Sequence, residues 1–435
     1  MPPLRLVLPL ALAALACGAD APAPSTSGPR RADPAPTDTL VADGDLVPLD
    51  SAVVARLVAE DPLWADALRI HFDALVIDGH VDTPTEMLLR GYDLGARHRA
   101  SGGSAHVDLP RMTEGGLDAP FFSLWVSRQF GEGPRATARA LAMLDEVERQ
   151  LAALPDAEIA RTSDDVRRIT RGGGAAILLG LEGGHALAGD VDVLRDLAAR
   201  GVRYVTLTHT NTNRLADSSH DEPRHGGLSP LGEAMVREMN RLGVLPDVSH
   251  VSDSTLADVL RVSQGPVLAS HSSARALVAN PRNLTDDQMR GIARTGGVVM
   301  INAYSPMVNG RLTEEVMDAA MERLRTRHGG DLGQLWRAIA EEQRARGIPE
   351  ATLDDVLDHI EHAVEIAGAD HVGLGTDFDG VPQLPAGFGD VTRLPWVTYG
   401  LLRRGMPEAD VRKVLGANAL RALEEAERLA ADLRE

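Results

Sequence analysis

The sequence contains one cysteine, one lysine and few aromatic residues. Cys17 is the only cysteine among 435 residues, which excludes an intramolecular disulfide. The formal net charge is −19 and the Lys and Arg residues form no basic block, which argues against nucleic-acid binding because phosphate contacts need clustered positive charge. Apolar residues make up 44% of the chain, enough to form a large buried core.

The amino-terminal segment is predicted to direct export. Arg5 precedes an apolar run at residues 6–16, which is too short to cross a bilayer as a mature helix but suits a secretory signal peptide. The run ends directly before Cys17, an arrangement that resembles a bacterial lipoprotein processing site. We therefore expect a signal peptide at 1–17 with Cys17 lipidated, a cell-envelope location and membrane contact only through that anchor. Plain secretion or a periplasmic location is the alternative.

A flexible tether is predicted to follow at 18–49. This stretch is rich in Ala, Pro, Ser and Thr and has no hydrophobic periodicity, so it cannot bury enough surface to order itself. The folded domain is expected at 50–435. It begins at Asp50-Ser51, which is suited to cap a helix over Val53–Phe72.

Eight segments have the composition of strands, and helical patterns separate most of them. Strands alternating with helices indicate parallel βα units, and eight of them favour an α/β fold, a (β/α)₈ TIM-like barrel of the metal-dependent hydrolase type. The predicted strands are 75–82, 119–126, 175–182, 202–209, 245–250, 266–271, 297–304 and 371–377. Helices are expected at 136–154, 191–199, 232–242, 254–262, 353–366 and 407–433, with two more, 314–328 and 331–346, in the long connection 305–370.

Six of the predicted strands end in a side chain that can bind a metal. These side chains are His80 with Asp82, Glu182, His209, His250, His271 and Asp377. Because the carboxyl ends of parallel strands meet at one end of a barrel, we expect them to lie together. His80 and Asp82 point to the same side of their strand and could bind one cation. His250 and His271 could bind a second, and Glu182 could bridge the two.

The single lysine narrows the choice of bridging group. Many two-metal barrel hydrolases use a carboxylated lysine, but Lys413 lies in the predicted carboxyl-terminal helix, away from any strand end. The bridge must then be a carboxylate, and Glu182 is the candidate. Nitrogen and oxygen ligands without a thiolate favour Zn²⁺, two ions per chain, over Mn²⁺ or Co²⁺.

The remaining strand-end residues suggest a hydrolytic mechanism. A hydroxide between the two metals would be the nucleophile. Asp377 is placed to orient that hydroxide and to pass its proton to a leaving amine. His209 has no obvious metal partner and is expected to stabilise the developing oxyanion.

Together these motifs resemble the membrane (renal) dipeptidase family of metal-dependent amidohydrolases, over residues 75 to about 420. The resemblance rests on Asp78-Gly-His80-Val-Asp82, Leu181-Glu182-Gly-Gly-His185, Thr206-Leu-Thr-His209, Asp247-Val-Ser-His250, Ser270-His271-Ser-Ser-Ala and Gly375-Thr-Asp377-Phe-Asp379-Gly380. It implies hydrolysis of small dipeptides, including some with a D-residue at the carboxyl-terminal position. It also implies zinc ligation by His80, Asp82, bridging Glu182, His250 and His271.

The same resemblance implies roles for residues beside the metals. Asp377 would be the catalytic carboxylate, His209 would contact the substrate carbonyl, and Arg282 would pair with the carboxylate of the dipeptide. His185 is expected to have a structural or supporting role. His359 and His362 are one helical turn apart and are expected on an exposed helix face.

Other functions stay open at this point. The chain could be an amidohydrolase that acts on a non-peptide amide, an N-acyl amino acid or a lactone, and dependence on Arg282 would separate these substrates from dipeptides. It could also be a surface binding protein that has kept the barrel without turnover, which the complete ligand set and Asp377 argue against. The sequence leaves a homodimer open.

Overall fold

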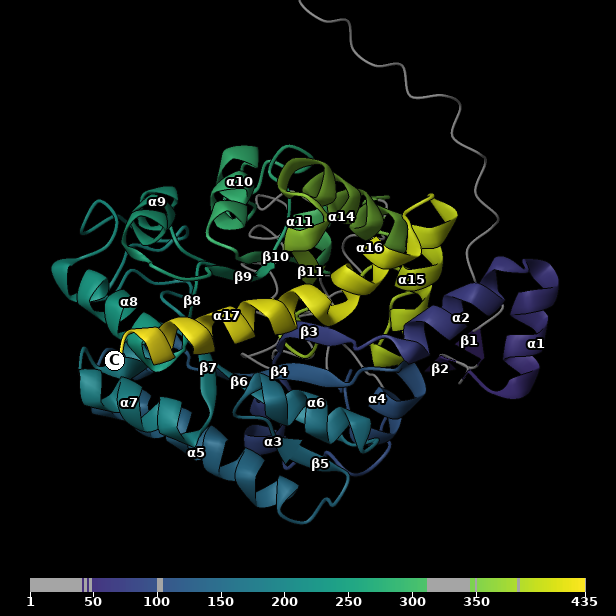
Figure 1. Ribbon diagram of the computed structural model, residues 1–435, viewed down its shortest axis with the longest axis horizontal. Coiled ribbons are helices and arrows are strands. Elements are labelled where there is room, and N and C mark those ends of the chain that lie inside the picture. Colours follow the sequence, from purple (N-terminus) through teal and green to yellow (C-terminus); the bar gives the residue numbers. More distant parts are fainter. Residues whose placement is uncertain are drawn as a thin grey trace, which may run out of the picture. The chain divides into compact units, whose positions relative to one another are not determined.

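The computed structural model describes residues 41–42, 45–46, 49–99, 105–310, 345–348, 350–381 and 384–434 (Figure 1). The predicted signal peptide at 1–17 and most of the predicted tether at 18–49 lie outside these residues. So do the helical pattern at 314–328 and all but the last two residues of the one at 331–346. A short antiparallel pair, β1 (Val41–Ala42) and β2 (Asp45–Leu46), precedes the barrel domain.

Eight parallel strands close into a barrel, as the sequence predicted. Each strand pairs in parallel with the next around the ring, and β4 also pairs with β6, which closes the circle. In chain order the strands are β3 (Ile77–Val81), β4 (Ala119–Trp125), β6 (Ala175–Glu182), β7 (Val202–Thr206), β8 (Leu245–Asp247), β9 (Leu268–Ser272), β10 (Val298–Ile301) and β11 (Val372–Leu374).

A ninth strand, β5 (Ala157–Ile159), was missed by the sequence analysis. It pairs only with β6, outside the closed ring. With three residues it is too short to show a periodic pattern. Its place on the outside of the barrel leaves the eight-strand ring unchanged.

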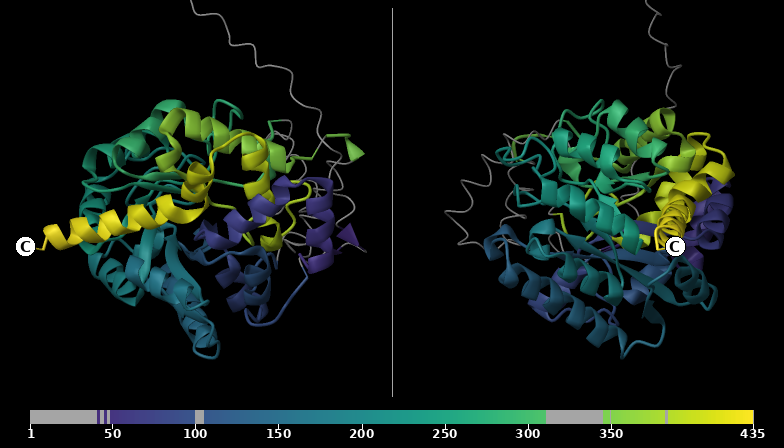
Figure 2. Two further views of the ribbon diagram at one scale, coloured as in Figure 1. Left: turned by 45° about the vertical axis from the view of Figure 1, so that its right-hand side comes forward. Right: turned by 60° about the vertical axis from the view of Figure 1, so that its left-hand side comes forward.

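Helices surround the barrel on the outside (Figures 1 and 2). The predicted helices after the strands are confirmed within a few residues as α5 (Pro134–Leu151), α7 (Val191–Arg200), α8 (Pro230–Leu242), α9 (Asp253–Val262) and α14 (Leu353–Ala367). Further helices are α3 (Thr83–Arg90), α4 (Leu109–Gly115), α6 (Ser163–Arg171), α10 (Asp286–Arg294), α11 (Ser305–Val308) and α15 (Leu394–Arg403). None of the described helices is long and apolar enough to span a membrane.

The first predicted helix is two helices. Asp50 caps α1 (Ser51–Glu60) as expected, accepting hydrogen bonds from the backbone N–H groups of Ala52 and Val53. The continuous helix over Val53–Phe72 is wrong, because the chain turns extended at Asp61 and restarts at α2 (Leu63–Asp73). Pro62 explains the break, since it lacks an N–H and disfavours helical geometry in the residue before it.

The carboxyl-terminal helix closes one end of the barrel. It consists of α16 (Glu408–Arg412), a π-helical turn (Lys413–Ala417) and α17 (Asn418–Asp432), which runs across the barrel in Figure 1. Asn418 Nδ2 donates to the carbonyl of Val372 at the start of β11. Leu420 and Leu423 pack with Ile77 and other interior residues of the barrel. This helix therefore covers the amino-terminal ends of the strands and leaves the opposite end for the site.

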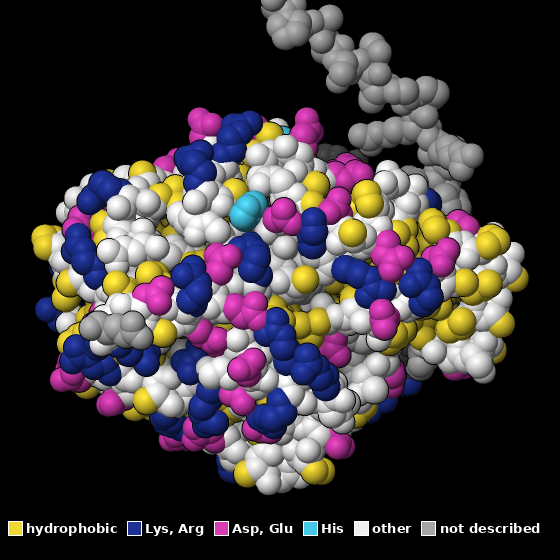
Figure 3. Space-filling view, in the orientation of Figure 1, with side chains coloured by type: hydrophobic (Ala, Val, Ile, Leu, Met, Phe, Trp, Pro, Cys, Tyr) yellow, Lys and Arg dark blue, Asp and Glu magenta, His cyan; other side chains and the backbone are white. Residues whose placement is uncertain are grey.

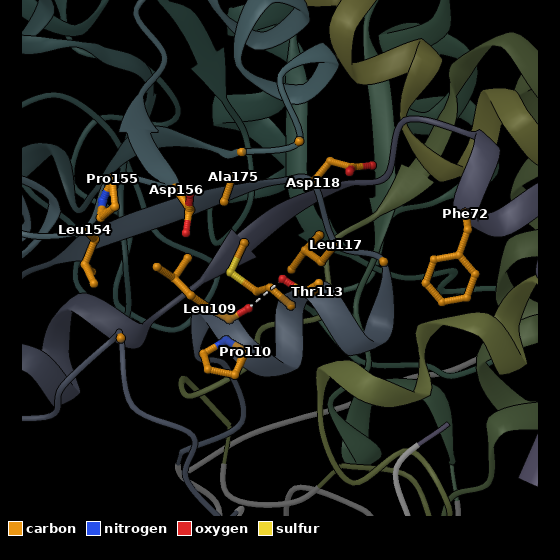
Figure 4. Close-up of a pocket in the computed structure, with 15 residues that line it drawn as sticks. Phe72, Leu109, Pro110, Thr113, Leu117, Asp118, Leu154, Pro155, Asp156 and Ala175 are labelled. Carbon is orange, nitrogen blue, oxygen red and sulfur yellow. Dashed lines mark hydrogen bonds between the residues drawn. The ribbon is translucent and has the colours of Figure 1, made fainter. Parts of the chain in front are cut away.

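A groove of about 370 Å³ also lies near the amino-terminal ends of the strands. Figure 4 shows the apolar side chains of Leu109 and Leu117 beside the carboxylates of Asp118 and Asp156. Asp118 directly precedes β4, whereas the predicted metal ligands lie at the carboxyl-terminal ends of the strands. The groove is therefore separate from the predicted site.

The surface mixes charges of both signs. Figure 3 shows Lys and Arg side chains interleaved with Asp and Glu on the face presented there. Many of the described arginines form ion pairs with neighbouring carboxylates, for example Arg168 with Glu158 and Arg195 with Glu238.

Candidate metal centre

The predicted metal ligands come together at the carboxyl-terminal end of the barrel. His80 and His271 lie within β3 and β9, Glu182 ends β6, and His209, His250 and Asp377 follow β7, β8 and β11 by three residues. Three groups of side chains bring their ligand atoms within 4.8 Å of one another: His80, Glu182 and His271; Glu182, His209 and His250; and His80, Asp82 and Asp377. The predicted convergence is therefore present.

Glu182 lies at the centre of this cluster. Its Oε1 is 3.1 Å from His250 Nε2 and 3.5 Å from His271 Nε2, while its Oε2 is 3.3 Å from His80 Nε2. Ser123 Oγ, on the neighbouring strand β4, donates to Oε2 over 3.3 Å. A carboxylate whose two oxygens face different histidines is placed to bridge two cations.

His80 and Asp82 form one side of the cluster. Their Nε2 and Oδ2 atoms are 3.3 Å apart, and both side chains are buried. Among the described residues, His80 Nε2 and Asp82 Oδ1 have no hydrogen-bond partner. Buried polar atoms almost always have a hydrogen-bond partner. Lone-pair atoms that lie close together without such partners therefore fit a metal site.

His250 and His271 form the other side. Their Nε2 atoms are 2.9 Å apart. Burial lowers the pKa of both imidazoles well below the usual histidine value, and the Arg282 guanidinium lowers it further. Neutral imidazole is the form that binds metals, so the environment of this pair favours ligation.

The backbone is strained where the strands end. His250, Asp377 and Asp379 have φ values of 69°, 64° and 66°, in the left-handed region that side chains with a Cβ rarely adopt. Gly380 has no room for a side chain, because a Cβ there would lie 2.0 Å from Asp82 Oδ2 and 2.4 Å from Asp377 Oδ1. Such strain is typical of functional sites, where it aims side chains inward.

Asp377 lies beside the His80 and Asp82 side of the cluster. Burial raises its pKa to about 7, and the nearby carboxylates of Asp82 and Glu182 act in the same direction, while His80 opposes them. Asn302, just after β10, donates from Nδ2 to Asp377 Oδ2 over 2.9 Å. This carboxylate is therefore fixed in position at the edge of the group of candidate ligands.

His209 lies on the other flank of the site. Its ring centroid is 4.4 Å from that of His250, and burial lowers its pKa to about 4. Trp125 Nε1 donates to His209 Nδ1 over 3.4 Å. His209 is therefore a neutral imidazole whose Nδ1 is occupied, which leaves Nε2 as the nitrogen available to a ligand.

Arg282 reaches the site from the loop after β9. Its guanidinium donates to the His271 carbonyl over 3.1 Å and lies 3.5 Å from Ser272 Oγ. Burial lowers its pKa to about 10, so it stays positively charged at neutral pH. This buried guanidinium, close to the candidate ligands, can bind a carboxylate.

The structure places the other histidines as follows. His185 is buried in the short 3₁₀ turn after β6. The prediction of an exposed helix face is wrong for His359, which is buried and accepts a hydrogen bond from the backbone N–H of Ala274 at Nδ1. His362 lies 2.8 Å from Asp286. The error arose because α14 packs against α10 and the adjacent strands, so the face that carries His359 is covered.

Four residues of the site were missed. Ser123 and Trp125 come from β4, Tyr204 from β7 and Asn302 from the end of β10. No site residue was predicted on β4 or β10, although both segments were predicted as strands. Polar side chains at the ends of these predicted strands were the available signal.

The comparisons with known proteins agree with this geometry. Residues 64–435 match the family model of the membrane dipeptidase, peptidase family M19. Dipeptidase tcpJ of Claviceps purpurea is 36% identical over 377 residues, covering 85% of this chain and 76% of that protein. Dipeptidase verJ of Clonostachys rogersoniana is 32% identical over 401 residues, covering 88% of this chain and 92% of that protein.

Solved structures are similar over most of the chain as well. The probable dipeptidase PvdM from Pseudomonas aeruginosa has a TM-score of 0.73 and 28% identity, covering 85% of this chain and 99% of its own. A metallo peptidase from Rhodobacter sphaeroides, liganded with a phosphinate mimic of the dipeptide L-Ala-D-Ala, has a TM-score of 0.66 and 26% identity. That match covers 81% of this chain and 99% of its own.

Proposed function

Since the chain belongs to the membrane dipeptidase family, peptidase family M19, and is a metal-dependent dipeptidase, we propose that it works with two zinc ions and accepts dipeptides with a D-residue at the carboxyl-terminal position. The metal proposal is supported by the convergence of buried imidazole and carboxylate groups around Glu182, among which His80 Nε2 and Asp82 Oδ1 have no hydrogen-bond partner within the described residues. The phosphinate mimic of L-Ala-D-Ala bound to the similar Rhodobacter sphaeroides peptidase supports the stereochemical proposal.

The donor set fits two cations. His80 and Asp82 would bind one, His250 and His271 the other, and Glu182 would bridge them with its two oxygens. The set contains only imidazole and carboxylate groups, which suits Zn²⁺. Bound cations would polarise the peptide carbonyl and lower the pKa of a water molecule toward about 7.

Asp377 is proposed to transfer a proton from the attacking water to the leaving amine. Its side chain lies with His80 and Asp82 in one cluster, where an attacking water would also lie. Asn302 fixes Oδ2, so Oδ1 is the oxygen that can accept a proton from water and return it to the leaving amine.

His209 and Arg282 are proposed to bind the substrate. With Nδ1 of His209 facing the Trp125 donor, its neutral ring would carry the proton on Nε2, and this N–H would donate a hydrogen bond to the substrate carbonyl oxygen as negative charge develops. Arg282 would bind the terminal carboxylate and so favour substrates with a free carboxyl group.

An assay on metal-stripped protein tests this proposal. The protein is reloaded with Zn²⁺ and offered L,L- and L,D-dipeptides, N-acyl amino acids and a lactone. Zinc-dependent cleavage of dipeptides, including the L,D series, is the expected result. Zinc-dependent turnover of the lactone or the N-acyl amino acids alone would favour the alternative amidohydrolase activity.

We further propose that the protein is exported and anchored through lipidated Cys17. The support is the apolar run at 6–16 that ends at this cysteine. Incorporation of labelled palmitate into the wild-type protein but not into Cys17→Ala, expressed in a bacterium, is the expected result. Equal labelling of both proteins would contradict it.

A further inference from the structure

Tyr204 lies inside the barrel, in contact with His80, one of the candidate metal ligands. It is on β7 and is fully buried, and its hydroxyl oxygen is 2.8 Å from His80 Nδ1. The tyrosine ring is close to parallel with the imidazole, with centroids 6.3 Å apart and planes at 23°. Phe121 packs against the same ring at a centroid distance of 5.1 Å. The phenol therefore has a defined place between the apolar interior and His80.

The neighbouring strand leaves a gap for this ring. Gly180 on β6 pairs with Tyr204 on β7. A Cβ at position 180 would lie 2.1 Å from Tyr204 Cζ and 2.3 Å from Cε2, closer than real atoms approach. Only glycine lets the ring cross the strand at this point, so the interior is built around the tyrosine.

The other nitrogen of His80 faces the cluster. Its Nε2 is 3.3 Å from both Asp82 Oδ2 and Glu182 Oε2 and has no hydrogen-bond partner among the described residues. An imidazole binds a cation through a nitrogen lone pair, so the proton of a neutral His80 must then be on Nδ1. The group 2.8 Å from Nδ1 is the Tyr204 hydroxyl.

We propose that Tyr204 is a positioning residue for the metal site, whose hydroxyl oxygen accepts the Nδ1–H of His80 and so keeps Nε2 directed at the cation. A hydrogen bond of this kind fixes the orientation and the tautomer of a ligating histidine and increases its basicity. Phenylalanine would fill the same space but would leave the buried Nδ1–H of His80 without its partner, which is unfavourable.

A comparable contact occurs at another candidate ligand. Ser270 Oγ lies 2.8 Å from His271 Nδ1 and donates to Asp247 Oδ2 over 2.8 Å. His250 Nδ1, by contrast, has no hydrogen-bond partner within the part of the chain that the structure describes. Hydroxyl groups thus face the outer nitrogen of one histidine on each side of Glu182, and Tyr204 serves the side formed by His80 and Asp82.

The test is zinc affinity, measured by competition with a chelator in the absence of substrate. Tyr204→Phe should lower the affinity for one zinc ion by about 10- to 100-fold. Tyr399→Phe is the matched control, because it removes a hydroxyl that donates to Asp61, and Tyr399 packs with Trp64 and Trp396 in an outer cluster that contains none of the proposed metal ligands. It should leave the affinity unchanged. The inference rests on the proposed metal site, but this readout does not depend on dipeptide hydrolysis.

Two measurements complete the test. The thermal unfolding temperature of the metal-free Tyr204→Phe protein should be close to that of metal-free wild type. Unchanged zinc affinity would overturn the inference, and so would a loss of affinity that merely follows a destabilised metal-free fold. In zinc-loaded wild type, ¹⁵N spectra of the histidines should show a protonated Nδ1 at His80, and an unprotonated Nδ1 would also overturn it.

Discussion

The side-chain amide of Asn302 donates to Asp377 Oδ2 over 2.9 Å. This bond joins the end of β10 to the loop after β11, where Asp377 has a φ of 64°. Asn302 is itself fully buried. The contact therefore fixes one carboxylate oxygen of Asp377, a residue that lies in one cluster with His80 and Asp82.

Asn302→Ala should lower kcat for dipeptide hydrolysis by roughly 10- to 100-fold, because a small displacement of a reacting group is costly. The bound metal content should not change, since Asn302 is not among the proposed ligands. Steady-state kinetics and metal analysis check both. Asn240→Ala is the control, because this buried asparagine bonds to Ser263 and Gln264 at the outer helices and should leave kcat unchanged. A normal kcat in Asn302→Ala would contradict the assignment.

Asp377→Asn should abolish turnover while two zinc ions remain bound. The amide has nearly the same shape as the carboxylate but cannot accept the proton of the attacking water. Single-turnover assays together with metal analysis test this. Activity of Asp377→Asn close to that of the wild type would show that another group transfers the proton.

Arg282→Lys should raise KM for dipeptides more than it lowers kcat, because a lysine retains the charge but loses the planar, two-pronged guanidinium. The same change should have little effect on a dipeptide amide, which has no terminal carboxylate. The comparison of kcat/KM for the acid and the amide gives the answer. Equal losses on both substrates would show that Arg282 supports the fold around His271 and does not select the carboxylate.

Buried His71 should make the fold sensitive to acid. Its Nε2 bonds to the Gly115 carbonyl and its Nδ1 to Thr398 Oγ1, each over 2.8 Å, and burial lowers its pKa from 6.5 to about 4. Because the pKa is lower in the folded state, the neutral ring contributes stability that is present above pH 6.5. This contribution is lost as the pH falls from 6.5 toward 4, by about 3 kcal/mol of unfolding free energy.

His71→Gln tests this, since glutamine can make similar hydrogen bonds but does not titrate. Urea unfolding of both proteins at pH 7 and at pH 4.5 should show a smaller loss of stability in the variant. The same loss in both would assign the acid sensitivity to other groups.

The barrel and the core of its site could be predicted because both depend on local patterns. Six of the eight predicted strands end in a side chain that can bind a metal, and parallel strands bring such ends together, so His80, Glu182 and His271 could be grouped without coordinates. Pro62 also predicts the break between α1 and α2 from the sequence alone, because proline disfavours helical geometry in the residue before it.

The supporting contacts depend on which side chains meet across different strands. The bond between Tyr204 and His80 joins residues 124 positions apart, and the one between Asn302 and Asp377 joins residues 75 apart. Their formation requires the register of the sheet, which no local pattern contains. His359 was misplaced for a similar reason, since its burial depends on the packing of α14 on the barrel.

The most direct test of the account is a zinc titration of metal-stripped protein that follows bound metal and dipeptide hydrolysis together, for wild type and Glu182→Gln. Wild type should bind two zinc ions per chain, with full activity only after the second. Glu182→Gln, which has a single carbonyl oxygen in place of the bridging carboxylate, should lose high-affinity binding of at least one ion together with activity. Full activity of wild type with one ion, or two tightly bound ions in Glu182→Gln, would contradict a two-zinc centre bridged by Glu182.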